Sequence, residues 1–283
     1  MMRSKLFVPA SRPELFAKAE ASAADSLSFD LEDSVVETRK DEARGILADY
    51  LKSRTANGKA IVVRINAANT GYFDADVEAM VAAGVEILNQ PMVRDLEDLA
   101  KLENRIAQYE RHPGRVKILA NIETPQSLRR AVALAVHPRV MGLQVGYADL
   151  LEPCGLDRRD EAVLSHIRLT VRFAAAEAGI PVYDGAFAGV SDPEFFEREC
   201  AAARRHGFSG KSCIHPSQVA IANKAFAPTE AEIARAHKII AAASHAKGAG
   251  AFLVDGQMID KPFLLRAQEI VRLSEQRSED RGA

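Results

Sequence analysis

The sequence has few cysteines, no tryptophan and no long apolar run. Its 283 residues include three cysteines, Cys154, Cys200 and Cys213, which are too few and too widely spaced for a disulfide framework or a cysteine metal site. We expect them to be buried, small apolar residues in a reducing cytoplasm. No apolar run approaches the roughly 20 residues that span a bilayer. The first residues, MMRSKLFVPASRP, reach charge and proline too early for a signal peptide.

The sequence also has no excess of charge of either sign. Its 37 Lys and Arg residues stand against 39 Asp and Glu residues, a net charge of −2. Without a basic excess to neutralise phosphates, we expect no broad nucleic-acid surface. The composition, 47% hydrophobic and 27% charged, is typical of a globular protein. This length allows two small domains or one large α/β domain.

Motifs of several common enzyme sites are missing. The seven histidines show neither HExxH nor HxH spacing, which argues against a zinc site. The sequence contains no P-loop and no GxSxG nucleophile turn, and no GxGxxG follows the first apolar run. These absences argue against P-loop nucleotide hydrolysis, α/β-hydrolase chemistry and dinucleotide binding.

The sequence instead alternates short apolar runs with patterns of helical spacing. Eight runs are predicted to be strands: Lys5–Pro9, Ser26–Leu31, Ala60–Ile65, Glu86–Gln90, Lys117–Ile122, Gly142–Gly146, Pro181–Asp184 and Gly210–Ile214. Eight β/α repeats, spaced by about 30 residues, predict a TIM (β/α)8 barrel. We place it at residues 1–242, with a C-terminal helical extension at 243–283. A doubly wound open sheet is the main rival, because periodicity does not show closure.

Two helix starts have the spacing of a capping box. They are Ser191-x-x-Glu194 and Thr229-x-x-Glu232. Pro262 is predicted to open the last helix of the chain. The extension exceeds what is needed to close a barrel, so we expect it to have a role of its own.

Polar residues follow the predicted strands, where a barrel of this kind places its active site. Along the chain they are Arg12, Asp30, Glu32, Asp33, Arg64, Glu123, Asp149, Asp184 and His215. Asp30, Arg64 and Glu123 lie within apolar runs, where an unpaired charge is costly. Asp184 fits a loop role as well as a functional one. His215, which precedes Pro216, is expected to be a hydrogen-bonded structural residue.

The residue types at these positions indicate a metal-dependent reaction on an acid. Glu123 and Asp149, at adjacent strand ends, suit Mg²⁺, which takes one or two carboxylates and completes its shell with water and substrate. Arg12 and Arg64 suit an anionic substrate, because a guanidinium binds a carboxylate through two hydrogen bonds. The alternatives are a structural ion pair of Arg64 with the acidic residues after the second strand, and a solvent contact for Arg12.

Sequence stretches spread along the chain resemble one known family. They are RSKLFVPASRP, FDLEDSV with KDEAR, VVRIN, NIETPQS, GYADL, YDGAF, GFSGKSCIHPSQV with NKAFAPTEAEI, and DGQMIDKP. With these, the sequence resembles the HpcH/HpaI aldolase and citrate lyase β-subunit superfamily. The resemblance is greatest to its CitE-like branch, which includes malyl-CoA and citramalyl-CoA lyases.

The resemblance implies a TIM barrel that assembles into homotrimers or hexamers, with the extension reaching a neighbouring subunit. It implies Mg²⁺ held by Glu123 and Asp149, and substrate binding by Arg12, Arg64 and Glu123. The catalytic residues that it implies are Arg64, Asp260, Glu32 and Asp33, of which Asp260 acts across the subunit interface. Asp30, Glu32 and Asp33 would hold metal-bound waters.

The sequence departs from the family pattern at several positions. Met92 and Arg94 replace the usual Lys and Glu after the fourth strand, Ala148 replaces a Glu, and Pro125 replaces an Ala. The proposed metal ligands and both arginines are retained. The changes near the fourth strand leave the identity of the substrate open.

The activity implied is carbon–carbon cleavage, or condensation, of a β-hydroxyacyl-CoA thioester such as malyl-CoA or citramalyl-CoA. The products of cleavage would be an acyl-CoA and a 2-oxo acid. Two alternatives stay open: a citrate lyase β subunit that works with an acyl carrier partner, and a catalytically silent binding homologue. A metal-free aldolase is a more distant possibility.

Overall fold

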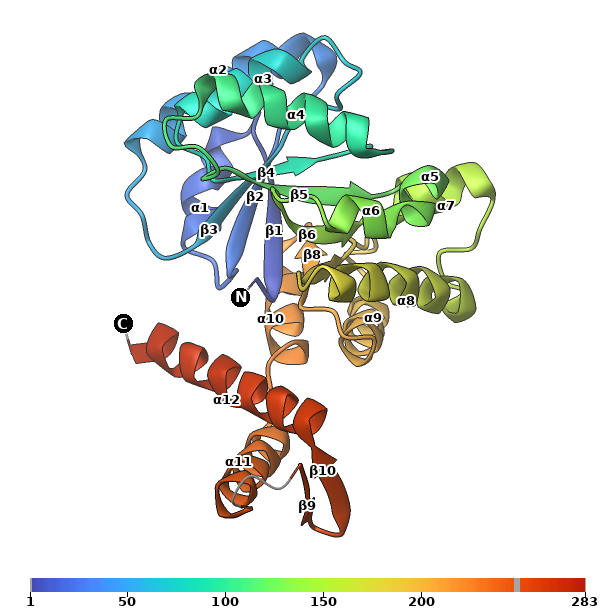
Figure 1. Cartoon of the computed structure of the whole chain (residues 1–283). Helices are drawn as coiled ribbons and strands as arrows, with labels where there is room; N and C mark the ends of the chain where they lie inside the picture. The colour runs from blue at the N-terminus through green and yellow to red at the C-terminus, as the bar shows by residue number, and fades with distance from the viewer. Residues whose placement is uncertain (1, 247–249, 283) are drawn as a thin grey trace. The chain divides into compact units, whose positions relative to one another are not determined.

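Eight parallel strands form a closed barrel in chain order (Figure 1). The computed structural model describes residues 2–246 and 250–282. The strands are β1 (Ser4–Pro9), β2 (Ser26–Asp30), β3 (Ala60–Arg64), β4 (Ile87–Gln90), β5 (Lys117–Ile122), β6 (Val140–Val145), β7 (Val182–Asp184) and β8 (Gly210–Cys213). β1 pairs with both β2 and β8, which closes the barrel. The predicted TIM barrel is therefore confirmed and the open sheet is wrong.

Helices follow the strands and cover the outside of the barrel (Figure 1). They are α1 (Phe16–Glu20), α2 (Lys40–Ser53), α3 (Phe73–Ala82), α4 (Leu96–Tyr109), α5 (Pro125–Arg129), α6 (Ala131–Ala135), α7 (Tyr147–Leu151), α8 (Glu161–Glu177), α9 (Pro193–Arg205) and α10 (Pro216–Ala225), with 3₁₀ turns η1 (Pro13–Leu15), η2 (Glu37–Arg39) and η3 (Glu152–Cys154). Outward strand residues such as Phe29 share one large core with helical residues such as Leu47 and Leu99. The apolar helix faces follow from this burial.

The inward-facing residues of the strands give the barrel a polar interior. Because side chains alternate along a strand, one apolar cluster (Met2, Val62, Leu119 and Tyr183) lies at the N-terminal ends of the strands. Polar side chains occupy the inward positions nearer the C-terminal ends. Gln144 Nε2 donates to Asn121 Oδ1 at 3.1 Å, and Ser212 Oγ lies 3.3 Å from Gln144 Oε1. This interior leads up to the predicted site.

The chain divides into two compact units, Met2–Phe226 and a second that begins at Ala227. The second unit holds α11 (Glu230–His245), the antiparallel strands β9 (Ala251–Val254) and β10 (Gln257–Asp260), and α12 (Lys261–Gly282). It has a core of its own, made by Ala236, Ile239, Val254, Ile259 and Ala267. The predicted division at residue 242 falls inside α11.

Local details confirm some sequence predictions and correct others. Thr229 and Glu232 form the predicted capping box of α11. The box predicted at Ser191 is wrong, because α9 is capped by Asp192, whose carboxylate accepts from the Phe195 amide at 3.1 Å. The expectation that every cysteine is buried is also wrong, because Cys154 is exposed.

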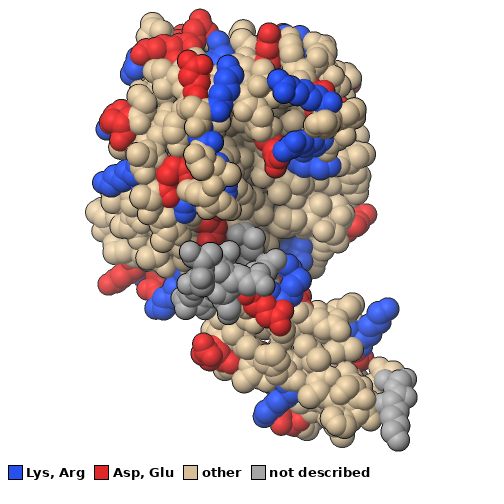
Figure 2. All heavy atoms as spheres, turned by 90° about the vertical axis from the view of Figure 1, so that its left-hand side faces the viewer, with Lys and Arg blue, Asp and Glu red and all other residues tan. Residues whose placement is uncertain are grey.

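Charged residues of both signs are interspersed on the face of the molecule shown in Figure 2. This distribution agrees with the net charge of −2. Within the described part of the chain, no helix is both long and apolar enough to cross a membrane.

Lys5 is a fully buried lysine in the barrel interior. Its Nζ lies 3.4 Å from Ser28 Oγ and 4.3 Å from the centre of the Phe7 ring. Burial, followed by the charge of Arg64, lowers its pKa from 10.5 to about 7. The folded protein therefore binds this proton less well than the unfolded chain, and the difference destabilises the fold below pH 10.5.

We expect Lys5→Met to raise the free energy of unfolding at pH 7.5, because methionine fills similar space without a charge to bury. The advantage should shrink between pH 7.5 and 9.5, by about 1.4 kcal/mol for each pH unit, because unfolding of the wild type takes up a proton at Lys5 and this uptake becomes less favourable as the pH rises. Urea unfolding at both pH values measures this. An equal advantage at both would show that Lys5 does not change its protonation on folding.

Candidate active site at the mouth of the barrel

Arg64, the last residue of β3, makes a two-pronged ion pair with Asp30 at the end of β2. Nε lies 2.7 Å from Oδ1, and Nη2 lies 2.8 Å from Oδ2. Asp30 and Arg64 are register partners in the parallel sheet, so their side chains emerge side by side. Although burial opposes ionisation, the Arg64 charge and hydrogen bonds hold the pKa of Asp30 below its usual range.

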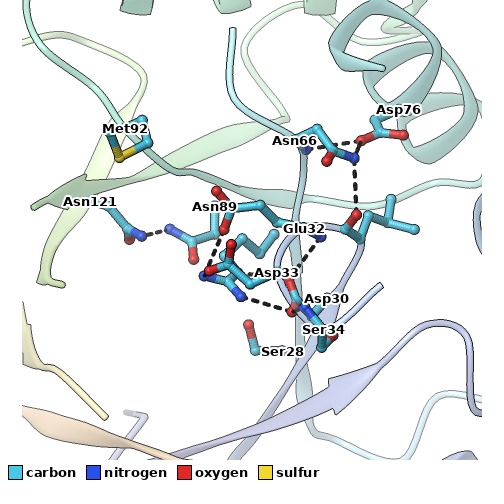
Figure 3. Close-up of polar contacts among 12 residues, drawn as sticks. Ser28, Asp30, Glu32, Asp33, Ser34, Asn66, Asp76, Asn89, Met92 and Asn121 are labelled. Carbon is cyan, nitrogen blue, oxygen red and sulfur yellow. Dashed lines mark hydrogen bonds and ion pairs between the residues drawn. The ribbon is translucent and has the colours of Figure 1, made fainter. Parts of the chain in front are cut away.

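Two further carboxylates face the same guanidinium (Figure 3). Arg64 Nη1 lies 2.7 Å from Glu32 Oε2 and 3.2 Å from Asp33 Oδ2. The contact with Glu32 is an ion pair without hydrogen-bond geometry, and Oε2 is buried with no hydrogen-bond partner in the described structure. Burial raises the pKa of Glu32 to about 8, with Arg64 opposing the shift and the Asp33 charge adding to it. One arginine therefore faces more negative charge than it neutralises.

The loop after β2 is fixed from behind by buried polar groups. Lys40 Nζ donates to the carbonyls of Leu31 (3.0 Å) and Glu32 (2.9 Å). Asn66 Nδ2 donates to the Leu31 carbonyl at 3.0 Å and to Asp76 at 2.6 Å (Figure 3). Because the loop carbonyls are bound on this side, the carboxylates of the loop face Arg64.

Glu123 follows β5 and is held by two donors. Asn121 Nδ2 donates to Oε2 at 2.9 Å, and the backbone N–H of Met92 donates to Oε1. Met92 adopts a left-handed backbone with φ 51°, which is uncommon for a non-glycine residue. Burial raises the pKa of Glu123 to about 7; the Met92 amide opposes this shift and the Asp149 charge adds to it.

Asp149 lies in the first turn of α7, directly after β6. Its side chain is exposed to solvent. Partial burial and the charge of Asp33 raise its pKa, and Arg64 opposes them. Gly146, between β6 and α7, has no room for a Cβ, because the Glu123 carboxylate occupies that space. Position 146 therefore requires glycine, and Asp149 is near enough for its charge to act on Glu123.

These side chains supply oxygen ligands. Within residues 2–246 and 250–275, no group of three or more His, Cys, Asp or Glu side chains could hold a metal ion. Two carboxylates are nevertheless the usual protein share for Mg²⁺, which keeps several waters and binds substrate oxygens. Burial raises the pKa of both Glu123 and Asp149, and a bound cation would favour their ionised forms.

The structure brings together most of the residues that the sequence singled out. Those at the barrel mouth are Asp30, Glu32, Asp33, Arg64, Glu123 and Asp149. Arg12 follows β1, but its side chain is 57% exposed and its Nε pairs with Glu14 Oε1 at 2.9 Å. Asp260 ends β10 in the other compact unit, where its Oδ1 is buried and has no described hydrogen-bond partner.

Sequence reasoning missed several residues that shape the site. Asn89 and Asn121 are hydrogen-bonded to each other at 2.7 Å beneath Glu123. Both stand at inward-facing strand positions, and alternation from Glu123 would have placed Asn121 on the same face. The contact made by the Met92 amide could not be predicted from the sequence, because every residue except proline has the same backbone N–H. The structural role predicted for His215 is confirmed, since its ring caps α10 by accepting from the Ser217 amide.

Comparison with known proteins identifies the family of this chain. The sequence profile of the HpcH/HpaI aldolase/citrate lyase family matches residues 3–216. The citrate lyase subunit beta of Leuconostoc mesenteroides is 35% identical over 97% of this chain and 93% of its own length. A (3S)-malyl-CoA thioesterase of Cereibacter sphaeroides is 32% identical over 96% of this chain and 94% of its own.

A solved structure shows the same fold. The protein CitE of Mycobacterium tuberculosis, crystallised with magnesium, acetoacetate and coenzyme A, superposes with a TM-score of 0.78 at 32% identity. The match covers 96% of this chain and 97% of that one. The resemblance found in the sequence is confirmed.

We expect Arg64→Met to destabilise the fold at pH 7.5 by about 3–5 kcal/mol, because it leaves a buried carboxylate, Asp30, without its cation. The pKa of Asp30 would then rise above its unfolded value, so the variant should regain stability as the pH falls. Urea unfolding at pH 7.5 and 5.5 tests this. A deficit that grows at pH 5.5 would contradict the central role given to this ion pair.

Proposed function

Because the chain belongs to the HpcH/HpaI aldolase/citrate lyase family, we propose that it is a Mg²⁺-dependent lyase acting on β-hydroxyacyl-CoA thioesters. Malyl-CoA and citramalyl-CoA are the proposed substrates, and an acyl-CoA and a 2-oxo acid the products. The observation that carries this proposal is the juxtaposition of an oxygen-ligand pair, Glu123 and Asp149, with the half-buried Arg64 at the barrel mouth. The CitE structure with magnesium, acetoacetate and coenzyme A supports the same ligand classes.

We assign the metal to Glu123 and Asp149. Bound there, Mg²⁺ would act as a Lewis acid toward the oxygen and carboxylate of the oxo-acid half. Asn121 and the Met92 amide already orient Glu123 through hydrogen bonds to both of its oxygens. Ligands held in this way need little reorganisation on binding.

Arg64 is the proposed stabiliser of the charge that develops when the carbon–carbon bond breaks. Asp30 locks its guanidinium in place through two hydrogen bonds, so no reorientation is needed during the reaction. Glu32 and Asp33, on the same guanidinium, are the proposed acceptors, through water, of the substrate hydroxyl proton. Arg12, exposed after β1, is the proposed second contact for an anionic part of the substrate.

Asp260 is the proposed group for proton transfer at the acyl carbon. In the cleavage direction it would protonate the carbon that the departing oxo acid leaves behind. In the condensation direction it would remove that proton. By family resemblance it acts on the site of a neighbouring subunit in a trimer or hexamer.

Two other activities have support from the comparisons. The 35% identity with a citrate lyase β subunit keeps a carrier-bound substrate open. The 32% identity with a malyl-CoA thioesterase favours, as a second candidate, hydrolysis of the thioester bond. The two reactions of malyl-CoA differ in their products: a lyase releases acetyl-CoA and glyoxylate, whereas a thioesterase releases malate and free CoA.

The protein should convert malyl-CoA or citramalyl-CoA to an acyl-CoA and a 2-oxo acid in the presence of Mg²⁺, as chromatography of the thioesters will show. Glu123→Gln should lower the rate by about 10²-fold or more, because it removes a charged ligand. Glu86→Gln is the matched control: this exposed glutamate precedes β4 at the other end of the barrel and pairs with Arg115.

If free CoA and a hydroxy acid are the only products, the protein is a thioesterase and the proposed lyase activity is wrong. No turnover of CoA thioesters, but turnover of a substrate on an acyl carrier protein, would favour the citrate lyase β subunit. Tight binding of an oxo acid without any turnover would favour a silent homologue.

Asp260→Asn and Glu123→Gln should complement each other if Asp260 acts between subunits. In a randomly mixed 1:1 ring, about a quarter of the sites would combine an intact Glu123 with a neighbour's intact Asp260. Co-expression with two affinity tags yields the mixed oligomer for assay. Asp255→Asn, in the β9–β10 turn, is the control and should keep full activity. Mixed oligomers as inactive as the single variants would rule out action between subunits.

A further inference from the structure

α7 carries two residues with different surroundings. Asp149 is exposed at the barrel mouth, whereas Tyr147, two residues earlier, is 3% exposed. The helix is only five residues long, from Tyr147 to Leu151. A helix this short is marginal by itself. The direction of the Asp149 carboxylate therefore depends on what anchors the first turn.

The anchor is a buried ionic cluster behind β7 and β8. Tyr147 Oη donates to Asp184 Oδ1 at 2.6 Å. Arg168 donates to both oxygens of Asp184, from Nε at 3.1 Å and from Nη2 at 3.0 Å, and Lys211 Nζ donates to Oδ2 at 2.7 Å. Glu199 completes the cluster, 3.3 Å from Lys211 Nζ. All four charged side chains are at most 3% exposed.

The cluster allows the tyrosine little freedom. Arg158 lies over the Tyr147 ring, 4.0 Å from its centre. Gly185 packs closely against the ring as well. A Cβ at this position would lie 2.5 Å from the Val145 carbonyl oxygen and 2.7 Å from the Tyr147 ring. The ring of Tyr147 is packed, and its hydroxyl is bonded to a carboxylate that two cations hold in place, so both ends of the side chain are anchored.

We propose that Tyr147 is a positioning residue of the metal site: its bond to Asp184 fixes the first turn of α7 so that Asp149 faces Glu123. Gly146 connects Tyr147 to the metal site. It directly precedes Tyr147 in the chain, and its lack of a side chain makes room for the Glu123 carboxylate. This inference rests on the proposed function in one respect, because it takes Glu123 and Asp149 as the metal ligands. It gives the outer cluster, which the mechanism does not use, a role in the site.

The test measures metal binding directly, without turnover. Mn²⁺ is titrated into the purified protein and free Mn²⁺ is read by electron paramagnetic resonance. Tyr147→Phe keeps the ring and removes only the hydroxyl, and should raise the Mn²⁺ dissociation constant about threefold to tenfold. Tyr183→Phe is the matched control. It removes a buried hydroxyl next to Asp184 from a side chain that faces the apolar end of the barrel interior, and should leave the constant unchanged.

The outcomes separate this inference from the function it rests on. Tyr147→Phe with an unchanged constant, while Asp149→Ala abolishes binding, would overturn the positioning role and leave the metal assignment intact. A hydroxyl of purely structural importance would give that result together with a lower unfolding temperature. Unimpaired Mn²⁺ binding by Asp149→Ala would overturn both. Should Tyr147→Phe fail to fold, Arg158→Met decides: a weaker constant supports the role, and an unchanged one overturns it.

Discussion

A single half-buried guanidinium organises the mouth of this barrel. Arg64 has little access to solvent, and the carboxylates of Asp30, Glu32 and Asp33 surround it. A charge in such a place is tolerated only with partners of opposite sign, and the partners in turn need the charge. Asp30 ends β2 and Arg64 ends β3, so the ion pair is fixed by the barrel. The loop after β2, which carries Glu32 and Asp33, must therefore adopt a conformation that brings these carboxylates to Arg64. Lys40 and Asn66 complete the arrangement from behind.

The negative charge that Arg64 does not neutralise gives the site its chemical character. Glu32 and Glu123 have raised pKa values for the same reason: each is buried near other carboxylates. A divalent cation is the partner proposed for this set. The polar barrel interior below, from Ser212 through Gln144 and Asn121 to Glu123, extends this arrangement by hydrogen bonds. The site is therefore the upper end of a polar column.

Much of this could be predicted from the sequence, and the reasons for the misses are physical. Eight apolar runs predicted the barrel, because burial on both faces leaves a clear pattern, and charged or titratable residues after seven of them predicted the face on which these residues gather. The hairpin at Asp255-Gly256 was not predicted, although its turn residues, with φ values of 49° and 79°, suit such a turn. The ion pair of Asp30 with Arg64, weighed at first as an alternative to substrate binding, exists alongside the proposed catalytic role. Backbone donors and tertiary clusters, such as the Met92 amide and the Asp184 network, leave no periodic signal.

The backbone hydrogen bond to Glu123 leaves the side chain at position 92 free to vary. Its Oε1 is bound by the main chain of Met92, whose side chain is 39% exposed and is not needed for that bond. The position can therefore exchange one side chain for another while the carboxylate keeps its orientation. The loop after β4 is thus a place where a side chain can change without disturbing the hydrogen bond that orients Glu123. By the family resemblance, methionine takes the place of a lysine at this position, and such a change keeps the backbone contact to Glu123.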